Sequence, residues 1–284
     1  MPKHRFKKYE RSKTPPAFRI GSADFQILEI LSDYRFLDTR QILSLCPGQA
    51  ERTIKRKLLN LFQAGYIERP IQQFSYFKPS EYLVYSLGKK GAALVSQNNG
   101  LAVKAKPSRE IGVSFLNHSL MVSGFRLVLK LALEKTGRLK LRVWKEPGLI
   151  DAIHYEGERY PIAPDAFFTI ESEEYLMHFF LEADRSTMTL ERMLNKFKGY
   201  WNWRLEGGQK RKLDIANFRV LTVCISEERA ENLRQIAKKA DANQAGSEMF
   251  LFACEKAYNL ENSENILQPI WSTPKDDNPR HILE

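Results

Sequence analysis

The stretch "PDAFFTIESEEYLMHFFLEADRS", residues 164–186, constrains the fold of this chain most strongly. It predicts two strands joined by a turn at "ESEE". The second strand, "YLMHFFLEAD", has apolar residues at successive positions, so both of its faces need cover from other elements. It therefore belongs in the middle of a sheet that is flanked by helices.

The rest of the second half supplies those helices and further strands. Apolar periodicity and turn residues predict the order helix, three strands, helix, strand, helix, strand from residue 113 onward. "STMTLERMLNKFKGYWNWRLEGG" reads as a helix with a buried stripe, and Ser226 is the expected N-cap of the helix that follows it. The stripe is formed by Leu190, Met193, Leu194, Phe197 and Trp201. The predicted fold class is α+β, with a mixed sheet.

Charge separates the two halves of the chain. Of its 44 Lys+Arg and 34 Asp+Glu, residues 1–112 hold 20 and 9, which leaves 24 and 25 for the remainder. The positive excess therefore lies in the first part and favours a polyanionic partner, most naturally nucleic acid. No apolar run is long enough to span a membrane, and no secretory signal is recognisable. Three widely spaced cysteines indicate reduced thiols, so we expect a cytoplasmic protein.

The basic part predicts a winged helix-turn-helix. Three helices are expected over residues 22–35, 38–48 and 48–69, the last ending at Gly65, and a β-hairpin follows in "SYFK" and "EYLVYSL". In this arrangement the third helix enters the major groove of duplex DNA and the hairpin reaches the backbone. The residues predicted to contact DNA are Arg52, Lys55, Arg56, Lys57, Lys78, Lys89 and Lys90.

These patterns divide the chain into five parts. We expect a flexible basic arm at 1–17, the winged helix at 18–96, a linker at 97–112, the mixed-sheet domain at 113–272 and a mobile tail at 273–284.

Acidic residues interrupt the apolar strands at one end. Side chains alternate along a strand, so Glu182 and Asp184 share a face. With Ile170 placed opposite Tyr175, Asp165 falls one diagonal step from Glu182 on that face. Three carboxylates brought together beside apolar surface need a compensating charge, and Mg²⁺ prefers oxygen ligands. Asp165, Glu182 and Asp184 are therefore predicted as metal ligands and catalytic acids, and Lys196 as a catalytic cation on the next helix.

The order Pro164-Asp165, Glu182-Ala183-Asp184, "KFKGYW" resembles the PD-(D/E)xK nuclease arrangement. That resemblance implies acids that bind Mg²⁺ and a lysine that assists the attacking water. The sequence departs from it at one position, because Asp184 stands where the family usually has its lysine. Lys196, or else Lys198, would have to supply the cation from the helix.

A resemblance to the replication-relaxation proteins of bacterial plasmids and related elements covers nearly the whole chain. It rests on the basic winged helix, "LNHSLMV", "LRVWKE", "PDAFF" and "FLEADRSTMTLERMLNKFKGYW" in this order. It implies a DNA-associated role in plasmid replication, mobilisation or their control. Three functions stay open: a non-catalytic DNA-binding regulator, a Mg²⁺-dependent endonuclease or nickase, and an adaptor. The predicted partners are duplex DNA, replication or mobilisation proteins and a second copy of the chain.

Overall fold

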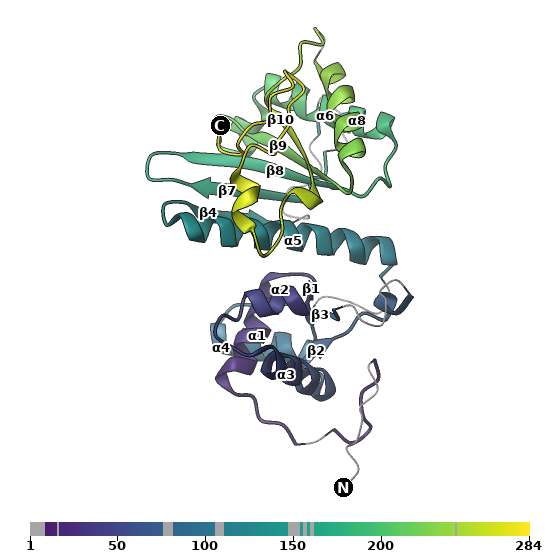
Figure 1. Cartoon of the computed structure of the whole chain (residues 1–284), viewed down its shortest axis with the longest axis vertical. Coiled ribbons are helices and arrows are strands. Elements are labelled where there is room, and N and C mark those ends of the chain that lie inside the picture. Colours follow the sequence, from purple (N-terminus) through teal and green to yellow (C-terminus); the bar gives the residue numbers. More distant parts are fainter. Residues whose placement is uncertain are drawn as a thin grey trace. The chain divides into compact units, whose positions relative to one another are not determined.

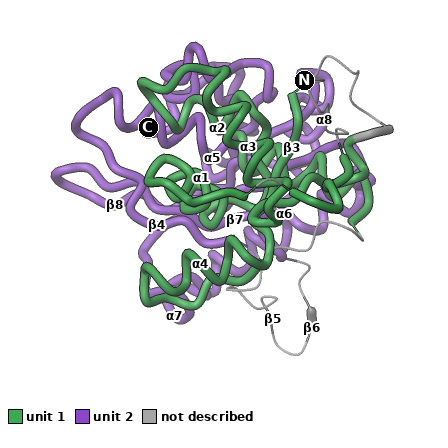
Figure 2. Tube along the Cα trace, turned by 90° about the horizontal axis from the view of Figure 1, so that it is seen from below, with its two compact units in different colours: residues 1–124 green, residues 125–284 purple. Residues whose placement is uncertain are grey.

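The computed structural model describes residues 9–15, 17–75, 82–105, 111–146, 154–155, 158–159, 162–241 and 243–284. The chain forms two compact units, residues 1–124 and 125–284, coloured separately in Figure 2. The division falls within one long helix, α5 (Val113–Thr136). α5 begins where the second domain is expected, whereas α4 (Lys89–Asn99) runs past residue 96, the expected end of the winged helix.

The first unit combines helices with a small antiparallel sheet. Its elements are α1 (Ser22–Asp33), β1 (Leu37–Asp38), α2 (Thr39–Ser44), α3 (Glu51–Ala64), β2 (Ile67–Glu68), a 3₁₀ turn (Ile71–Ser75), β3 (Val84–Leu87) and α4. The strands lie in the order β1-β3-β2, with both pairs antiparallel. Among the described residues β3 therefore pairs with both β1 and β2, and the predicted hairpin partner "SYFK" lies mostly outside them.

Local sequence explains where these helices begin and end. Asp38 caps α2 by accepting a hydrogen bond from the Gln41 amide, and Gln41 returns the interaction by accepting from the Asp38 amide. Gly65 ends α3 in the left-handed conformation at φ 83°, where a residue without Cβ is favoured. The apolar stripe predicted for α3 is buried, as Ile54, Leu58 and Leu61 are fully covered.

The described part of the basic arm packs against the end of α3. Arg11 donates from Nε to the Phe62 carbonyl at 2.8 Å and pairs with Glu68 at 2.9 Å. Gln63 is 3% exposed and binds the backbone of both Glu10 and Ser12. Glu10, Arg11 and Ser12 are therefore held against this unit, whereas Lys13, Thr14 and Pro15 are exposed.

The second unit is built on a five-stranded sheet, shown in Figure 1. Its strands are β4 (Lys140–Lys145), β7 (Ala166–Glu171), β8 (Leu176–Asp184), β9 (Arg219–Cys224) and β10 (Phe250–Cys254). The order is β10-β9-β8-β7-β4, antiparallel from β4 to β8 and parallel from β8 to β10. The sheet is mixed and β8 is its central strand, so the α+β prediction is confirmed. A short hairpin of β5 (His154–Tyr155) and β6 (Glu158–Arg159) lies outside it.

Helices cover both faces of the sheet (Figure 1). Phe167 and Phe180 face α6 (Leu190–Leu205), within an apolar cluster that also includes residues of α8 (Glu227–Ala237). Phe168 and Phe179 face the other way, and Phe125 of α5 lies 5.7 Å from Phe168 between ring centroids. Both faces of β8 are therefore apolar because helices cover the sheet on both sides, as the sequence predicts.

The buried stripe of α6 differs from the predicted one. Leu190 is 40% exposed, whereas the polar residues Lys196 and Tyr200 are buried, at 7% and 0% exposed. The helix is rotated so that Met193, Lys196, Phe197, Tyr200 and Trp203 face the sheet. Hydrogen bonds from Lys196 and Tyr200 to an acid on β8 explain why polar side chains occupy this face.

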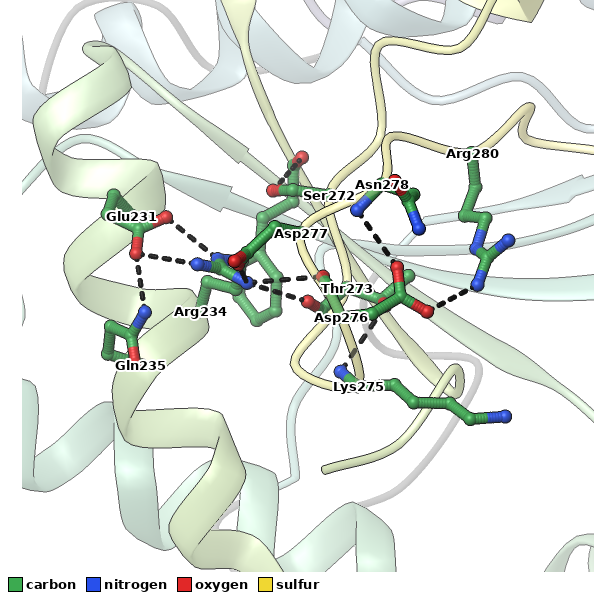
Figure 3. A network of polar contacts seen from close by, with 11 residues as sticks. Glu231, Arg234, Gln235, Ser272, Thr273, Lys275, Asp276, Asp277, Asn278 and Arg280 are labelled. Carbon is green, nitrogen blue, oxygen red and sulfur yellow. Dashed lines mark hydrogen bonds and ion pairs between the residues drawn. The ribbon is translucent and has the colours of Figure 1, made fainter. Parts of the chain in front are cut away.

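The C-terminal segment is packed onto the second unit rather than extended from it. Ser272 bridges to Phe252 on β10, and Trp271 and Ile282 are fully buried. Arg234 of α8 donates to the Thr273 and Asp276 carbonyls and pairs with Glu231 and Asp277 (Figure 3). Residues 271–284 are thus attached to this unit at several points, with Trp271, Thr273 and Ile282 buried.

Two further predictions concern the state of the cysteines and the absence of a membrane-spanning segment. Cys46, Cys224 and Cys254 are free and buried, as expected. Within the described ranges, no helix combines the length and apolarity that a membrane crossing requires.

Candidate functional site

Asp165 and Glu182 lie side by side at one end of the β7–β8 pair. The register pairs Ala166 with Leu181, which carries Asp165 to the position opposite Glu182. The Asp165 amide donates to the Leu181 carbonyl at 2.9 Å, and Asp165 Oδ2 accepts from the Ala183 amide at 2.7 Å. The two acids therefore share the face of the sheet that α6 covers, as the sequence predicts.

The register itself differs from the prediction by two residues. Ile170 pairs with Met177, and the turn occupies residues 172–175, closed by a Ser172 amide to Tyr175 carbonyl hydrogen bond at 3.0 Å. A shift of two keeps every side chain on its face. Asp165 and Glu182 consequently move from a diagonal to a direct pair, which brings the carboxylates closer together.

Glu182 is a buried acid with two fixed partners. It is 3% exposed, its Oε2 binds the Lys196 ammonium, and its Oε1 accepts from the Tyr200 hydroxyl at 2.6 Å. Burial raises the pKa of Glu182 to about 7, against the opposing effect of Lys196, and the nearby Asp165 carboxylate raises it further. Burial and the negative charge of Glu182 also raise the pKa of Tyr200.

Lys196 connects the two segments that carry the acids. Its Nζ also donates to the Ala163 carbonyl at 2.9 Å, two residues before Asp165. The predicted placement of this ammonium over the strand ends is therefore present. Lys198, the alternative cation, is exposed on the opposite side of α6.

Asp184 is bound elsewhere. Arg229 of α8 holds it through two bonds, Nε to Oδ1 at 2.8 Å and Nη2 to Oδ2 at 3.0 Å. The Ser186 amide donates to Oδ1 at 2.8 Å, and Asp184 is 5% exposed. Throughout the described ranges, no group of three or more His, Cys, Asp or Glu is arranged to hold a metal ion. The structure thus brings together two of the three predicted acids with the lysine, and ties the third to an arginine.

The first unit presents a second set of predicted residues. Arg52, Lys55 and Arg56 are exposed on α3, opposite its buried stripe. Lys55 pairs with Glu51 at 2.5 Å. Arg52 and Arg56 make no ion pair within the part of the chain that the structure describes. Their guanidinium groups are available to an external anion.

The other predicted DNA contacts fall in different places. Lys57 points toward α1, where Asp24 binds it at 3.0 Å, and its side chain is 21% exposed. Lys89 and Lys90 are exposed at the start of α4, and Lys90 Nζ donates to the Ala64 carbonyl at the end of α3 at 3.2 Å. Lys78 lies outside the described residues.

Three residues beside these sites escape sequence reasoning. Arg229 lies 45 positions after Asp184, so only the parallel β8–β9 pairing and the turn into α8 bring them together. Arg40 and Tyr82 meet near α3, with the guanidinium carbon 4.7 Å from the ring centroid. An isolated arginine at a helix start and a tyrosine before a strand give no signal of that contact.

Comparison with known proteins places the chain in a family. A structure of restriction endonuclease FokI is similar over 85% of this chain and 42% of its own, at 12% identity and a TM-score of 0.31, so the chain spans less than half of that protein. No curated protein sequence matches the chain. The sequence model of the replication-relaxation family matches residues 28–216, more than half of the length, from α1 to the segment before β9. The chain therefore belongs to the replication-relaxation family.

Proposed function

We propose that this protein binds duplex DNA through the exposed face of α3 and acts in the replication or mobilisation of a plasmid or mobile element, or in their control. The family supports a replication-related role. The order helix, strand, helix, helix, strand, strand, with the sheet order β1-β3-β2, supports a winged helix. In that arrangement α3 is the helix that enters the major groove.

The observation that carries the proposal is the two-sided character of α3. Ile54, Leu58 and Leu61 fix one side in the core, so Arg52 and Arg56 must face outward. They sit at i and i+4, one turn apart, as a pair of exposed cations on a helix surface. Arginine can bind a phosphate or a guanine edge with two parallel hydrogen bonds, which makes this surface suited to DNA.

Fluorescence anisotropy with a labelled duplex tests this proposal. Arg52→Ala/Arg56→Ala should weaken binding by at least tenfold, and the slope of log K against log[salt] should fall by about 1.8, about 0.9 for each phosphate that is no longer neutralised. Arg138→Ala/Lys140→Ala removes the same charge from exposed positions of the second unit and is the matched control. Equal affinities for the two double variants and the parent would refute binding by α3.

A specific observation favours a second function, metal-dependent cleavage of DNA. Asp165 faces Glu182, and Lys196 Nζ links Glu182 to the Ala163 carbonyl. These are three of the groups that the PD-(D/E)xK resemblance implies. We propose Asp165 and Glu182 as the Mg²⁺ ligands because they lie opposite each other on β7 and β8, whereas Asp184 lies two residues further along β8 and is bound by Arg229. Mg²⁺ would replace the Tyr200 or the Lys196 contact of one Glu182 oxygen.

Two carboxylates suit Mg²⁺, which keeps several waters and takes further oxygens from phosphates. Such an ion would polarise a phosphate and lower the pKa of a bound water. Lys196 neutralises the buried Glu182 carboxylate, and Tyr200 donates to its second oxygen, so both fix that carboxylate beside Asp165. Arg229 neutralises the Asp184 carboxylate in the same way. Asp165 and Glu182 are therefore not repelled by a third unpaired negative charge.

Nicking of supercoiled plasmid tests this second function. We expect open circles to accumulate with Mg²⁺ or Mn²⁺, and to be absent with EDTA or with Asp165→Asn. Glu174→Gln, an exposed acid in the β7–β8 turn, is the control and should nick like the parent. Intact supercoils at high protein concentration with both ions, together with salt-sensitive DNA binding, would instead support the non-catalytic regulator or adaptor.

A further inference from the structure

Arg40, Lys55 and Tyr82 form one cluster beside the exposed face of α3. Arg40 lies at the start of α2, Lys55 on α3, and Tyr82 two residues before β3. The Arg40 guanidinium carbon is 4.7 Å from the Tyr82 ring centroid, and Lys55 Nζ is 6.0 Å from the same centroid. A single aromatic ring thus contacts cations from two different helices.

All three side chains are open to solvent. Tyr82 is 40% exposed, and the side chains of Arg40 and Lys55 are 58% and 54% exposed. An aromatic ring that packs for stability would be covered, whereas this ring lies under two charged groups at the surface. Two cations and one aromatic ring are thus exposed together beside α3.

Each cation also has a carboxylate that fixes its direction. Asp38 accepts from Arg40 Nη2 at 2.9 Å and from Nε at 3.3 Å, while its other oxygen caps α2. Across the described residues, Arg40 Nη1 has no hydrogen-bond partner. Glu51 binds Lys55 at 2.5 Å. The ring and these acids together orient the two cations before any ligand arrives, which lowers the entropy lost on binding.

We propose that Arg40 and Lys55 grip the phosphate backbone of duplex DNA next to the groove that α3 enters, and that Tyr82 is the positioning residue for both. This inference rests on the proposed DNA-binding function and extends its surface from α3 to α2 and the approach to β3. Contacts to phosphate carry no sequence information, so the contribution of the cluster should be the same for every DNA sequence.

Anisotropy measurements on the full chain test the cluster. Arg40→Ala should weaken binding severalfold and lower the salt slope by about 0.9, equally for two unrelated duplexes. Tyr82→Ala should weaken binding about two- to fivefold, and Tyr82→Phe, which keeps the ring, should match the parent. In the Arg40→Ala background the effect of Tyr82→Ala should shrink, because one of its two cations is already absent.

Two outcomes distinguish a failure of this inference from a failure of the proposed DNA binding by α3. If Arg52→Ala/Arg56→Ala weakens binding while Arg40→Ala and Tyr82→Ala do not, the cluster is overturned and DNA binding stands. If Arg52→Ala/Arg56→Ala also has no effect, the proposed function itself fails. Full loss of binding by Tyr82→Phe would overturn the positioning role, since the ring is retained. Because all three residues are exposed, we expect the variants to fold like the parent. An unchanged melting temperature measured by circular dichroism checks this.

Discussion

Lys196 is held between two backbone segments and one buried carboxylate, so its removal changes more than a surface charge. Lys196→Met would leave Glu182 buried without its cation, and we expect the free energy of unfolding to fall by about 3–5 kcal/mol. Glu182→Gln/Lys196→Met removes both charges and should recover a large part of that loss. Urea denaturation measures both, with exposed Lys198→Met as the matched control. Equal stability of Lys196→Met and Lys198→Met would contradict a buried ion pair.

The same carboxylate predicts a pH dependence of stability. Its pKa is about 7 in the folded protein and near 4.5 when exposed, so between these values the folded state holds a proton that the unfolded state has released. Stability from this group is therefore full below about pH 4.5 and declines as the pH rises to about 7, by on the order of 1–3 kcal/mol.

Chemical denaturation at several pH values in EDTA checks this. Glu182→Gln should lack the decline and become relatively more stable toward pH 7. Burial also raises the pKa of Glu255, but that acid titrates in both proteins and cancels in the difference. Parallel stability curves for parent and variant from pH 4.5 to 7 would show that Glu182 is not perturbed.

At the scale of elements, α8 joins the acidic end of the sheet to the C-terminal segment. Its N-cap Ser226 accepts from the Arg229 amide, and the Arg229 side chain fixes Asp184 on β8. Further along the helix, Arg234 fixes residues 273–277, as Figure 3 shows. One helix therefore orders the end of the central strand and the end of the chain.

Arg234→Met should release this segment, because it keeps an unbranched apolar side chain but removes the guanidinium. The Thr273 and Asp276 carbonyls would lose a charged donor, and we expect a loss of about 2 kcal/mol in unfolding free energy. Limited proteolysis should then cut near residues 273–280 faster than in the parent. Lys239→Met, an exposed neighbour, should show neither effect. Unchanged cleavage would mean that the apolar anchors Trp271 and Ile282 suffice.

Across the whole molecule, sequence periodicity predicts the elements better than their partners. The main elements from α5 to β10, the cap Ser226 and the end of α3 at Gly65 follow from short-range chemistry that each segment carries itself. The β5–β6 hairpin and the short helix α7 (Gly208–Leu213) are not predicted. The two-residue error in the β7–β8 register arose because "ESEE" does not fix how many residues the turn contains. The side of the sheet on which each side chain lies is still predicted correctly, since a shift of two residues preserves the alternation.

Long-range pairing accounts for the remaining differences. Nothing near Lys57 indicates that Asp24, 33 residues earlier, binds it, and nothing near Asp184 indicates Arg229. The sequence predicts Lys196 beside the acids, but only the structure shows that Lys196 is buried and that Tyr200 donates a hydrogen bond to Glu182. Charged residues are assigned correctly only once the fold supplies their counter-charges.

Separate cores for the two units predict that the two proposed activities can be removed one at a time. Arg52→Ala/Arg56→Ala alters only solvent-facing groups of residues 1–124, so DNA affinity should fall at least tenfold without a change in melting temperature. Asp165→Asn alters residues 125–284, so it should abolish Mg²⁺-dependent nicking and keep the affinity of the parent within about twofold. At protein concentrations that saturate the DNA, the first variant should still nick, because its acids and Lys196 are intact. Loss of both activities in either variant, with the melting temperature unchanged, would show that the acids and the basic helix act as a single site.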